Sequence, residues 1–463
     1  MVSPDARPDA TLDAIFKAYD VRGTVPDQLD PALSERIGAA FARFVLDSAA
    51  GGPAPERVLV ARDMRESGVD LAAAFAEGVQ RQGLDVVDLG LASTDLVYFA
   101  AGHLDAPGAM FTASHNPARY NGIKMCLAGA RPIGQDTGLA EIRRMTAAGV
   151  EPAPSPPGRV EAMDLLGAFA DHVRSFVDVA ALAPLRVVAD TANGMGGLVV
   201  PRVFETLPVT LEVMYGELDG SFPNHPADPI QAENLRDLQA RVRETGADVG
   251  LAFDGDADRV FLVDDQGEPL SGSTTTAIVA KGILEKEPGA TILYNLICSH
   301  AVPEVIEENG GTAVRTRVGH SFVKAVMAET GAAFGGEHSA HYYFRDNFRA
   351  DSGSIAALMV LEQISKAGVP LSSLRKPFDR YAASGEINTT VDDAAAVIER
   401  VAAAYPDAAQ DRIDGLTVEL EDWWFNLRPS NTEPLLRLNL EARTREACDE
   451  RVAEVRALIS DKG

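Results

Sequence analysis

Apolar residues recur along the first part of the chain at spacings that predict alternating strands and helices. The short apolar runs Arg57–Ala61 and Leu84–Leu89 predict two strands, joined by a polar turn at Asp63–Gly68 and a helix. A longer helix is expected after Asp30, because proline suits a first helical turn and apolar residues follow at helical spacing, namely Leu33, Ile37, Phe41, Phe44 and Val45. This part of the chain therefore predicts an α/β arrangement.

One local pattern occurs at three widely separated places. Val58–Asp63, Val187–Gly194 and Thr291–Leu296 are each a short apolar run that ends in a polar turn and leads into a helix-like segment. A β–α unit begins in this way, so the pattern predicts three related α/β domains. Any α/β protein contains such runs, however, and the pattern alone leaves the relationship open.

The chain changes character from about Phe378 onward. The expected strands are Glu386–Val391, Thr417–Leu420 and Leu435–Leu440, and the expected helices are Ala394–Ala404 and Thr444–Ile459. This mixture predicts a separate, smaller α+β domain. Further upstream, the proline-rich segment Val150–Gly158 predicts a linker.

The composition narrows the classes of function. The chain of 463 residues is too long for one ordinary core, and its 46% apolar and 24% charged residues are typical of a globular protein. With 42 Lys and Arg against 68 Asp and Glu, the formal net charge is −26, which speaks against a general nucleic-acid binder. An anionic substrate would need local clusters of Arg and Lys to overcome this repulsive field.

The cysteines and the lack of long apolar runs indicate the compartment in which the protein is expected. Cys126, Cys298 and Cys448 match no zinc spacing and no disulfide framework, which favours a reducing compartment. The N-terminus has no basic region followed by an apolar run, and no stretch of about 18 apolar residues occurs. We therefore expect a cytoplasmic protein without a membrane partner.

The segment Asp254–Arg259 (DGDADR) follows the apolar run Val249–Phe253 and is the strongest chemical signal in the sequence. Three carboxylates at alternate positions of a tight loop can converge on one hard cation, and their mutual repulsion opposes folding without one. Mg²⁺ fits if waters or phosphate oxygens complete its octahedron. A calcium EF-hand needs glycine at the sixth position, where this chain has Arg259. A solvated acidic turn fits poorly after a strand of buried type.

Three further loops carry residues suited to phosphate or sugar. Thr112–Pro117 (TASHNP) follows an apolar run, and its small polar residues would expose backbone N–H groups to a phosphate, with Ser114 as the candidate nucleophile. Arg428–Pro434 (RPSNTEP) offers a guanidinium, hydroxyls and an amide that suit phosphate. Gly335–His341 (GGEHSAH) offers donors and acceptors for sugar hydroxyls. Read singly, the first two loops could also be ordinary turns, the third a metal loop, and no Gly-x-Ser-x-Gly elbow is present.

Taken together and in order, these segments resemble the motifs of the α-D-phosphohexomutase family, the phosphoglucomutase and phosphomannomutase group. Tyr19–Gly23 (YDVRG) is similar to the opening motif of the family, Thr112–Pro117 to its phosphoserine loop, and Asp254–Arg259 to its magnesium loop. Gly336–His341 resembles its sugar-recognition loop, and Arg428–Pro434 its phosphate loop. The likeness covers nearly the whole chain, and five motifs in the same order make it specific.

The resemblance implies an α/β protein of three related α/β domains with mixed sheets and a smaller α+β C-terminal domain. The family fold is heart-shaped, with the active site in a central cleft. We expect domains at residues 9–155 with the phosphoserine loop, 156–264 with the magnesium loop, 265–376 with the sugar-recognition loop, and 377–463 with the phosphate-binding loop.

The resemblance also implies roles for single residues. Ser114 would carry a phosphate in the resting enzyme, and Mg²⁺ would bind one phosphoserine oxygen together with Asp254, Asp256 and Asp258. The expected catalytic residues are Ser114, Arg22 and Arg259, which would neutralise the transferring phosphoryl group, and the proton-transfer candidates Lys124 and His320. The expected substrate-binding residues are Tyr19, His115, Arg317, Glu337, Ser339, His341, Arg428, Ser430, Asn431 and Thr432. Of these, Glu337 and Ser339 would hold the O3 and O4 hydroxyls of the sugar.

The implied reaction moves phosphate between the two ends of a hexose through a 1,6-bisphosphate that must turn within the site. Hexose 1,6-bisphosphate is therefore expected as an activator. The sugar loop resembles the Glu-x-Ser-Gly-His form of phosphomannomutases and bifunctional enzymes, which favours a phosphomannomutase. The alternatives are a phosphoglucomutase, a phosphoglucosamine mutase or a bifunctional phosphomannomutase/phosphoglucomutase, since mannose and glucose differ only at C2.

The sequence departs from the family pattern at one place and leaves other classes to consider. Ile297 stands where family members often have a lysine before Cys298, so no basic contact is expected there. A phosphatase of the haloacid-dehalogenase type would need an Asp-x-Asp-x-Thr-like motif, and Asp254–Asp258 lacks the threonine. A non-catalytic sugar-phosphate sensor would not need to keep both Ser114 and the three aspartates. We expect sugar phosphates as partners, no nucleic acid, and a monomer or dimer.

Overall fold

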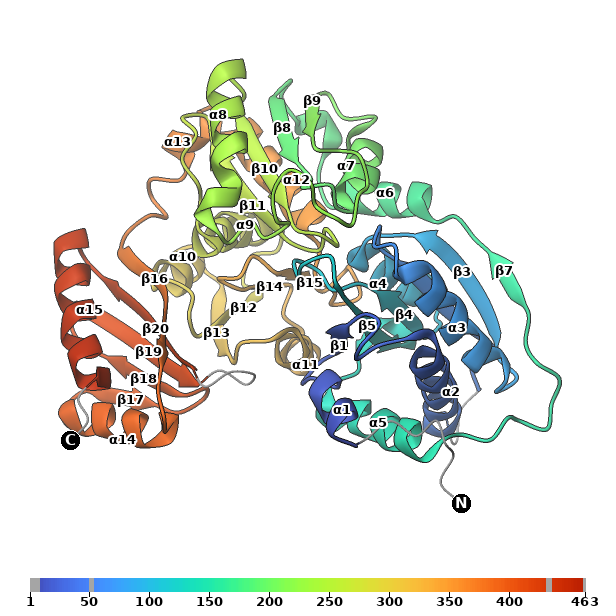
Figure 1. The fold of residues 1–463 in the computed structure, drawn as a ribbon. Coiled ribbons are helices and arrows are strands. Elements are labelled where there is room, and N and C mark those ends of the chain that lie inside the picture. Colours follow the sequence, from blue (N-terminus) through green and yellow to red (C-terminus); the bar gives the residue numbers. More distant parts are fainter. Residues whose placement is uncertain (1–8, 50–53, 430–434, 461–463) are drawn as a thin grey trace. The chain divides into compact units, whose positions relative to one another are not determined.

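The computed structural model describes residues 9–49, 54–429 and 435–460. The chain forms two compact units (Figure 1). The first unit comprises residues 1–270 and 341–372, and the second comprises residues 271–340 and 373–463. Each unit is described by itself below. No helix in the described ranges is long and apolar enough to cross a membrane.

The first sheet of the first unit is mixed and has the order β1-β5-β4-β2-β3-β7, with β6 beside β5. Its strands are Val21–Thr24 (β1), Arg57–Arg62 (β2), Asp85–Leu91 (β3), Gly108–Phe111 (β4), Tyr120–Leu127 (β5), Arg131–Pro132 (β6) and Val160–Ala162 (β7). β2 is parallel to β3 and β4, whereas β5 is antiparallel to β1 and β4. The predicted linker Val150–Gly158 contains no helix or strand, but β7 directly after it pairs with β3, which the sequence did not predict.

Helices cover this sheet on both faces. They are Asp9–Ile15 (α1), Pro31–Ser48 (α2), Gly68–Gln80 (α3), Thr94–His103 (α4) and Leu139–Ala148 (α5). The predicted start of α2 is confirmed, because the Asp30 carboxylate caps it by accepting from the Leu33 N–H at 2.8 Å. Val58 and Val60 of β2 share the core with α2 and α3, so Leu59 between them faces α4.

The second sheet of the first unit has the order β11-β10-β8-β9 and is also mixed. Its strands are Arg186–Asp190 (β8), Thr210–Met214 (β9), Val249–Phe253 (β10) and Val260–Asp264 (β11). The helices of this part are Leu166–Arg174 (α6), Gly196–Phe204 (α7), Arg236–Thr245 (α8) and Gly353–Ala367 (α12). Strand β15 (Tyr342–Phe344) precedes α12, and the short helix α13 (Leu371–Leu374) follows it. Single 3-10 turns lie at Ala128–Ala130 (η1), Gln135–Thr137 (η2), Val179–Ala181 (η3) and Ala232–Leu235 (η4).

The second unit contains two sheets. In the first, Thr291–Asn295 (β12) lies between Thr312–Thr316 (β13) and Phe334–Gly336 (β14), both parallel to it. The helices of this part are Gly272–Lys286 (α9), Ala301–Glu308 (α10) and His320–Thr330 (α11). The second sheet is antiparallel, with the order β16-β20-β19-β18-β17. Its elements are Ala382–Thr390 (β16), Ala394–Ala404 (α14), Ala409–Asp411 (β17), Leu416–Glu419 (β18), Trp423–Pro429 (β19), Leu435–Ala442 (β20) and Arg445–Ser460 (α15).

The strand connections show that three domains share one topology. Strands β2, β8 and β12, the three strands predicted from the recurring pattern, each lie between two parallel neighbours. In every case the chain continues as helix, strand, helix and strand, with the next strand on one side and the later one on the other. The predicted fold class, three related α/β domains and a smaller α+β domain, is confirmed.

Candidate active site

The predicted phosphoserine, magnesium and sugar loops occupy the same position in the three related domains. Thr112–Pro117 begins directly after β4, Asp254–Arg259 directly after β10, and Glu337 directly after β14. Each of these strands is the third of its β-α-β-α-β run. Ligands of open α/β sheets bind beyond the carboxyl ends of the parallel strands, so the shared topology places the candidate residues where such a fold builds sites.

Ser114 lies within hydrogen-bond distance of the acidic loop. Its side chain is buried, and its Oγ donates to Asp254 Oδ2 at 2.7 Å. Arg259 Nη2 donates to the same Oγ at 3.3 Å. The Ser114 backbone has a φ of 49°, a left-handed conformation that residues other than glycine rarely adopt. The strained turn thus presents the predicted nucleophile to the predicted metal loop.

The three aspartates of the loop converge as the sequence predicted. Asp254, Asp256 and Asp258 are all buried, and one carboxylate oxygen from each lies within 4.8 Å of the others. The Oδ1 atoms of Asp256 and Asp258 are buried and accept no hydrogen bond from any described residue. Buried carboxylate oxygens without partners are costly, and hard cations prefer such donors. The residues therefore fit a divalent cation such as Mg²⁺.

Basic side chains offset part of this negative charge. Lys124 Nζ on β5 donates to Asp256 Oδ2 and to Asp258 Oδ2, both at 2.8 Å. Burial alone would lower the pKa of Lys124, but the two carboxylates outweigh it and raise the pKa well above its usual value. Arg259 Nε donates to Asp254 Oδ2 at 2.9 Å. Burial nevertheless raises the pKa of Asp254 to about 7.

Arg22 and His115 join the same group of side chains. Arg22 Nη1 donates to the Asn116 carbonyl Oδ1 at 2.7 Å, so β1 contacts the Ser114 loop. His115 Nδ1 accepts from Arg259 Nη2 at 2.7 Å, and burial and the neighbouring cations lower the pKa of His115 to about 2. His115 is therefore neutral. Tyr19 lies in the bend before β1.

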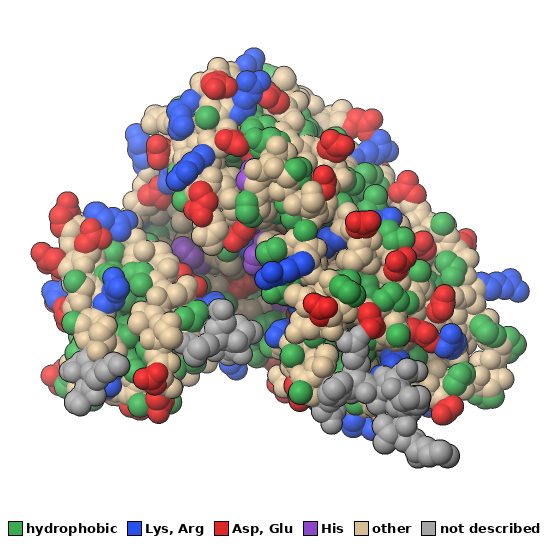
Figure 2. Space-filling model, in the orientation of Figure 1, with side chains coloured by type: hydrophobic (Ala, Val, Ile, Leu, Met, Phe, Trp, Pro, Cys, Tyr) green, Lys and Arg blue, Asp and Glu red, His purple; other side chains and the backbone are tan. Residues whose placement is uncertain are grey.

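Basic side chains gather around Ser114 although the net charge of the chain is strongly negative. Figure 2 shows acidic and basic side chains interspersed over the visible surface. The side chains of Arg22, Lys124 and Arg259 instead gather around Ser114 and the acidic loop. Lys124 and Arg259 pair with the carboxylates of the loop, so the excess of acid in the whole chain is largely balanced at this place, and their remaining N–H groups could bind an anion.

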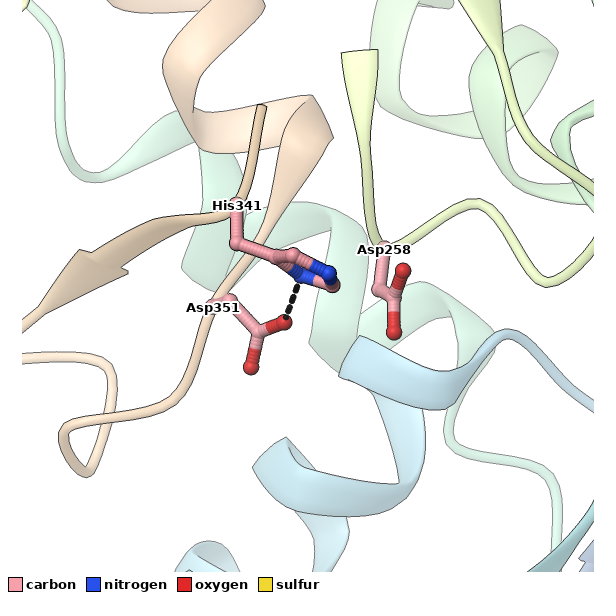
Figure 3. Close-up of side chains that lie close together, drawn as sticks. All are labelled: Asp258, His341 and Asp351. Atoms are coloured by element: carbon pink, nitrogen blue, oxygen red, sulfur yellow. Dashed lines mark hydrogen bonds and ion pairs between the residues drawn. The ribbon is translucent and has the colours of Figure 1, made fainter. Parts of the chain in front are cut away.

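His341 adjoins the acidic loop from another part of the first unit. Its Nδ1 lies 2.8 Å from Asp351 Oδ2, and Figure 3 shows its ring between Asp351 and Asp258. Burial alone would lower the pKa of His341, but the hydrogen bond with Asp351 outweighs it and raises the pKa. The sequence singled out His341 as a sugar contact but did not predict Asp351, which orients its ring.

In the second unit, Glu337 connects two predicted segments. Its buried Oε1 accepts from the Gly319 N–H at 3.0 Å and from Asn295 Nδ2 at 3.1 Å. Gly319 lies between Arg317, whose guanidinium is 4.3 Å from the centre of the Phe322 ring, and His320, the first residue of α11. The segment with Arg317 and His320 therefore lies beside Glu337. Ser339 is half-buried in the turn after Glu337.

Arg428 of β19 lies opposite Arg437 of β20, a residue the sequence did not single out. Both guanidiniums share Glu386, at 3.8 Å and 3.7 Å, and the buried Nε of each has no hydrogen-bond partner among the described residues. Glu386, and Asp414 at 3.7 Å from Arg428 Nη1, offset part of the repulsion between the two guanidiniums, and the N–H groups left without an acceptor suit a phosphate. The other predicted members of this loop, Ser430, Asn431 and Thr432, lie outside the described residues.

Thr94 is another site neighbour that the sequence did not single out. Its Oγ1 donates to Asp256 Oδ2 at 2.5 Å, and its backbone N–H donates to the Asp256 carbonyl at 3.0 Å. Groups that hydrogen-bond to a metal ligand fix its orientation. In the sequence, Ser93 and Thr94 indicate no more than the start of a helix, which Ser93 caps. A helix start does not indicate that Thr94 contacts Asp256, which is far away in the sequence.

Models of all four domains of one protein family match this chain. The models of phosphoglucomutase/phosphomannomutase alpha/beta/alpha domains I, II and III match residues 13–152, 167–267 and 271–381, and the model of the C-terminal domain matches residues 386–458. A protein of Xanthomonas campestris pv. campestris described as "Phosphohexose mutases" is 42% identical over 433 residues, which are 92% of this chain and 95% of that protein. A phosphomannomutase of Salmonella montevideo is 39% identical over 439 residues, 92% of this chain and 94% of its own.

A solved structure agrees with these relatives. The crystal structure of a phosphoglucomutase/phosphomannomutase family protein from Burkholderia thailandensis has a TM-score of 0.86 and 32% sequence identity, and covers 96% of this chain and 97% of its own. The chain therefore belongs to the phosphoglucomutase/phosphomannomutase family of phosphohexomutases, which are isomerases.

Proposed function

We propose that this enzyme interconverts mannose 6-phosphate and mannose 1-phosphate through phosphorylated Ser114 and a 1,6-bisphosphate intermediate. The observation that carries the proposal is the position of Ser114 Oγ, between the Asp254 carboxylate and the Arg259 guanidinium beside three convergent aspartates. Relatives named phosphomannomutase at 38–39% identity favour mannose as the sugar. A phosphoglucomutase or a bifunctional phosphomannomutase/phosphoglucomutase is the alternative.

The side chains around Ser114 have distinct proposed tasks. The sugar hydroxyl attacks the phosphorus of phosphoserine, the bond to Ser114 Oγ breaks, and the hydroxyl proton passes from the sugar oxygen to a base, for which His320 is the candidate. Arg259 and Arg22 would take up the charge that develops on the transferring group. Lys124, whose Nζ is held protonated between two carboxylates, is the proposed donor that returns a proton to Ser114 Oγ, and His320 is the other proposed proton-transfer group.

A divalent cation is part of the proposal. Asp254, Asp256 and Asp258, with one oxygen of the phosphoserine, would hold Mg²⁺, and the unpartnered Oδ1 atoms support this donor set. Such an ion supplies positive charge that polarises a phosphoryl group. Thr94 and Lys124 then serve to orient the Asp256 carboxylate that would face it.

The sugar and the distant phosphate would be held by residues of the second unit. Glu337 and Ser339 are the proposed contacts for O3 and O4, and Arg428 and Arg437 the proposed clamp for the non-reacting phosphate. None of these contacts reads C2, where mannose and glucose differ. Assays of kcat/KM with mannose, glucose and glucosamine 1-phosphates test whether mannose is the preferred sugar. A higher kcat/KM with glucose or glucosamine 1-phosphate would contradict the proposal of a phosphomannomutase.

Hexose 1,6-bisphosphate is expected to activate enzyme that has lost its phosphate. The intermediate can escape while it turns, and each escape leaves Ser114 unphosphorylated and inactive. We expect a phosphatase-treated sample to show a lag that a trace of hexose 1,6-bisphosphate removes. Turnover without a lag, and without any response to bisphosphate, would contradict a reorienting intermediate.

Replacing Arg428 by alanine is expected to lower kcat/KM by about 10–150-fold, because a charged hydrogen bond contributes roughly 1.5–3 kcal/mol. KM should rise, and kcat should fall because the sugar loses its alignment. Arg428→Lys should recover only part of the loss, since lysine keeps the charge but not the fork. Steady-state kinetics measure this effect.

Arg412→Ala is a matched control in the same domain. Arg412 forms an exposed ion pair with Glu399, and such pairs contribute little to stability or function. It should keep wild-type kinetics. If Arg428→Ala also does so, the pair formed by Arg428 and Arg437 is not a phosphate clamp.

A further inference from the structure

Arg65 lies behind the Ser114 loop and is fully enclosed by protein. It follows β2 in the polar turn Asp63–Gly68, and its side chain is 1% exposed. The Phe222 ring covers the guanidinium with a centroid distance of 5.1 Å. A buried cation of this kind needs partners for all of its N–H groups, because an unpaired one would carry the full penalty of desolvation.

The five N–H groups of Arg65 all find acceptors, and four of those acceptors are carbonyls of the Ser114 loop and of Tyr120, the first residue of β5. Nη2 donates to the carbonyls of Ser114 and Asn116 at 2.8 and 2.6 Å, and Nη1 donates to the carbonyls of Pro117 and Tyr120, both at 2.9 Å. Nε donates to Asp63 Oδ2 at 3.2 Å. A guanidinium has five N–H donors in a rigid fork, so the loop carbonyls and Asp63 saturate it.

The first of these carbonyls belongs to Ser114 itself. Ser114 has the left-handed φ of 49°, a conformation that persists only when the surroundings enforce it. A Cβ added at Gly255 of the acidic loop would lie 2.4 Å from the same Ser114 carbonyl oxygen. The carbonyl is thus held between the Arg65 guanidinium on one side and the backbone of the acidic loop on the other.

The charge balance around Arg65 indicates a positioning role rather than a contribution to stability. Asp63 is its one anionic partner and is likewise fully buried. Burial raises the pKa of the Asp63 carboxyl and lowers the pKa of the Arg65 guanidinium, and each partner only partly offsets the shift of the other. A buried pair of this kind is weak evidence for stability, and in some proteins such a pair specifies one geometry.

We propose that Arg65 is a positioning residue that fixes the backbone of the Ser114 loop and so aims Ser114 Oγ at the acidic loop. The inference rests on the proposed function of Ser114 as the phosphate carrier. Arg65 touches neither Ser114 Oγ nor any aspartate of the acidic loop through a described hydrogen bond, so its influence passes through the peptide carbonyls. It binds the first and the last turn of the loop together, which a lysine with its single nitrogen cannot do.

The test compares Arg65→Lys with Arg119→Lys in the full-length enzyme. Arg119 lies in the same loop, is exposed, and stacks over the Tyr120 ring at 5.4 Å. For Arg65→Lys we expect kcat to fall by about 10–100-fold, because a displacement of about 1 Å has that effect, while the calorimetric affinity for mannose 6-phosphate changes little. Amide hydrogen exchange in residues 112–120 should rise in this variant, with and without phosphate on Ser114. Arg119→Lys should match the wild type in all three measurements.

A wild-type kcat, or unchanged exchange in residues 112–120, would overturn the proposal, as would a loss of affinity that parallels the loss of kcat. If Arg65→Lys does not fold, Asp63→Asn gives the same decision, because it removes the charge that anchors Nε and so loosens the hold of the guanidinium on the loop carbonyls. The intact mass after incubation with hexose 1,6-bisphosphate tests the role of Ser114 as phosphate carrier separately from the role of Arg65. A wild-type enzyme that gains no phosphate refutes the proposed function, whereas the exchange comparison still decides whether Arg65 fixes the loop.

Discussion

Ser114→Ala is expected to lower kcat by at least about 10³-fold, because removing a residue that forms a covalent intermediate closes the main reaction path. In the proposed mechanism Ser114 Oγ carries the phosphate in each turnover, and no other hydroxyl lies as close to Asp254 and Arg259 in the hydrogen bonds of the described residues. The wild type should gain one phosphate from hexose 1,6-bisphosphate by intact-protein mass spectrometry. The variant should gain none.

The fold of this variant should be unaffected. Alanine has a Cβ as serine does, so the strain of the left-handed φ at position 114 is the same in both proteins. The lost hydrogen bond to Asp254 leaves that carboxylate with Arg259. We expect the free energy of unfolding to change by no more than about 1 kcal/mol. Ser67→Ala is the matched control, because Ser67 Oγ accepts from Asn121 Nδ2, which is not one of the proposed site residues. Near-normal turnover of Ser114→Ala would remove the nucleophile assignment.

Local sequence patterns predicted the elements of this fold well, and the recurring pattern pointed to the right architecture. Apolar runs such as Val249–Phe253 and Ala394–Ala404 coincide with β10 and α14, because burial on one face imposes a regular spacing. The shared order of strands around β2, β8 and β12 could not be seen in the sequence. Strand pairing depends on contacts between distant segments, which is also why β7 was not expected. The domain boundaries themselves stay a prediction.

The site was predictable where its residues sit together in one motif, and less so where single residues reach it from elsewhere. The spacing of three aspartates in one short loop is enough to predict a cation site at Asp254, Asp256 and Asp258. Arg65 and Thr94 do not, because an arginine in a turn and a threonine at a helix start have many ordinary explanations, and their partners are 49 and 162 positions away. A motif in the sequence thus indicates the proposed catalytic groups more readily than the residues proposed to hold them in place.

Removal of divalent cations, or replacement of Asp256 by asparagine, is expected to lower kcat by roughly 10³-fold, since metal charge contributes several kcal/mol in such reactions. Asp256 contributes one unpartnered Oδ1 to the loop, and its Oδ2 is held by Thr94 and Lys124. EDTA-treated wild type should recover activity with added Mg²⁺, whereas Asp256→Asn should not. Asp422→Asn is the control, because Asp422 is 72% exposed and pairs with Arg443. Both residues are far in sequence from the aspartates proposed to bind the metal.

Cation binding should also depend on pH, with a sign that the structure fixes. Burial raises the pKa of Asp254 to about 7 when no cation is present, so below that pH a proton competes with the cation for this carboxylate. The apparent affinity for Mg²⁺ should therefore weaken as the pH falls through about 7 and level off above it. Binding should raise the midpoint of thermal unfolding of the wild type, and by less at low pH, because only the folded chain assembles the three carboxylates. Full activity after exhaustive chelation, or a wild-type Mg²⁺ response in Asp256→Asn, would show that the acidic loop has another purpose.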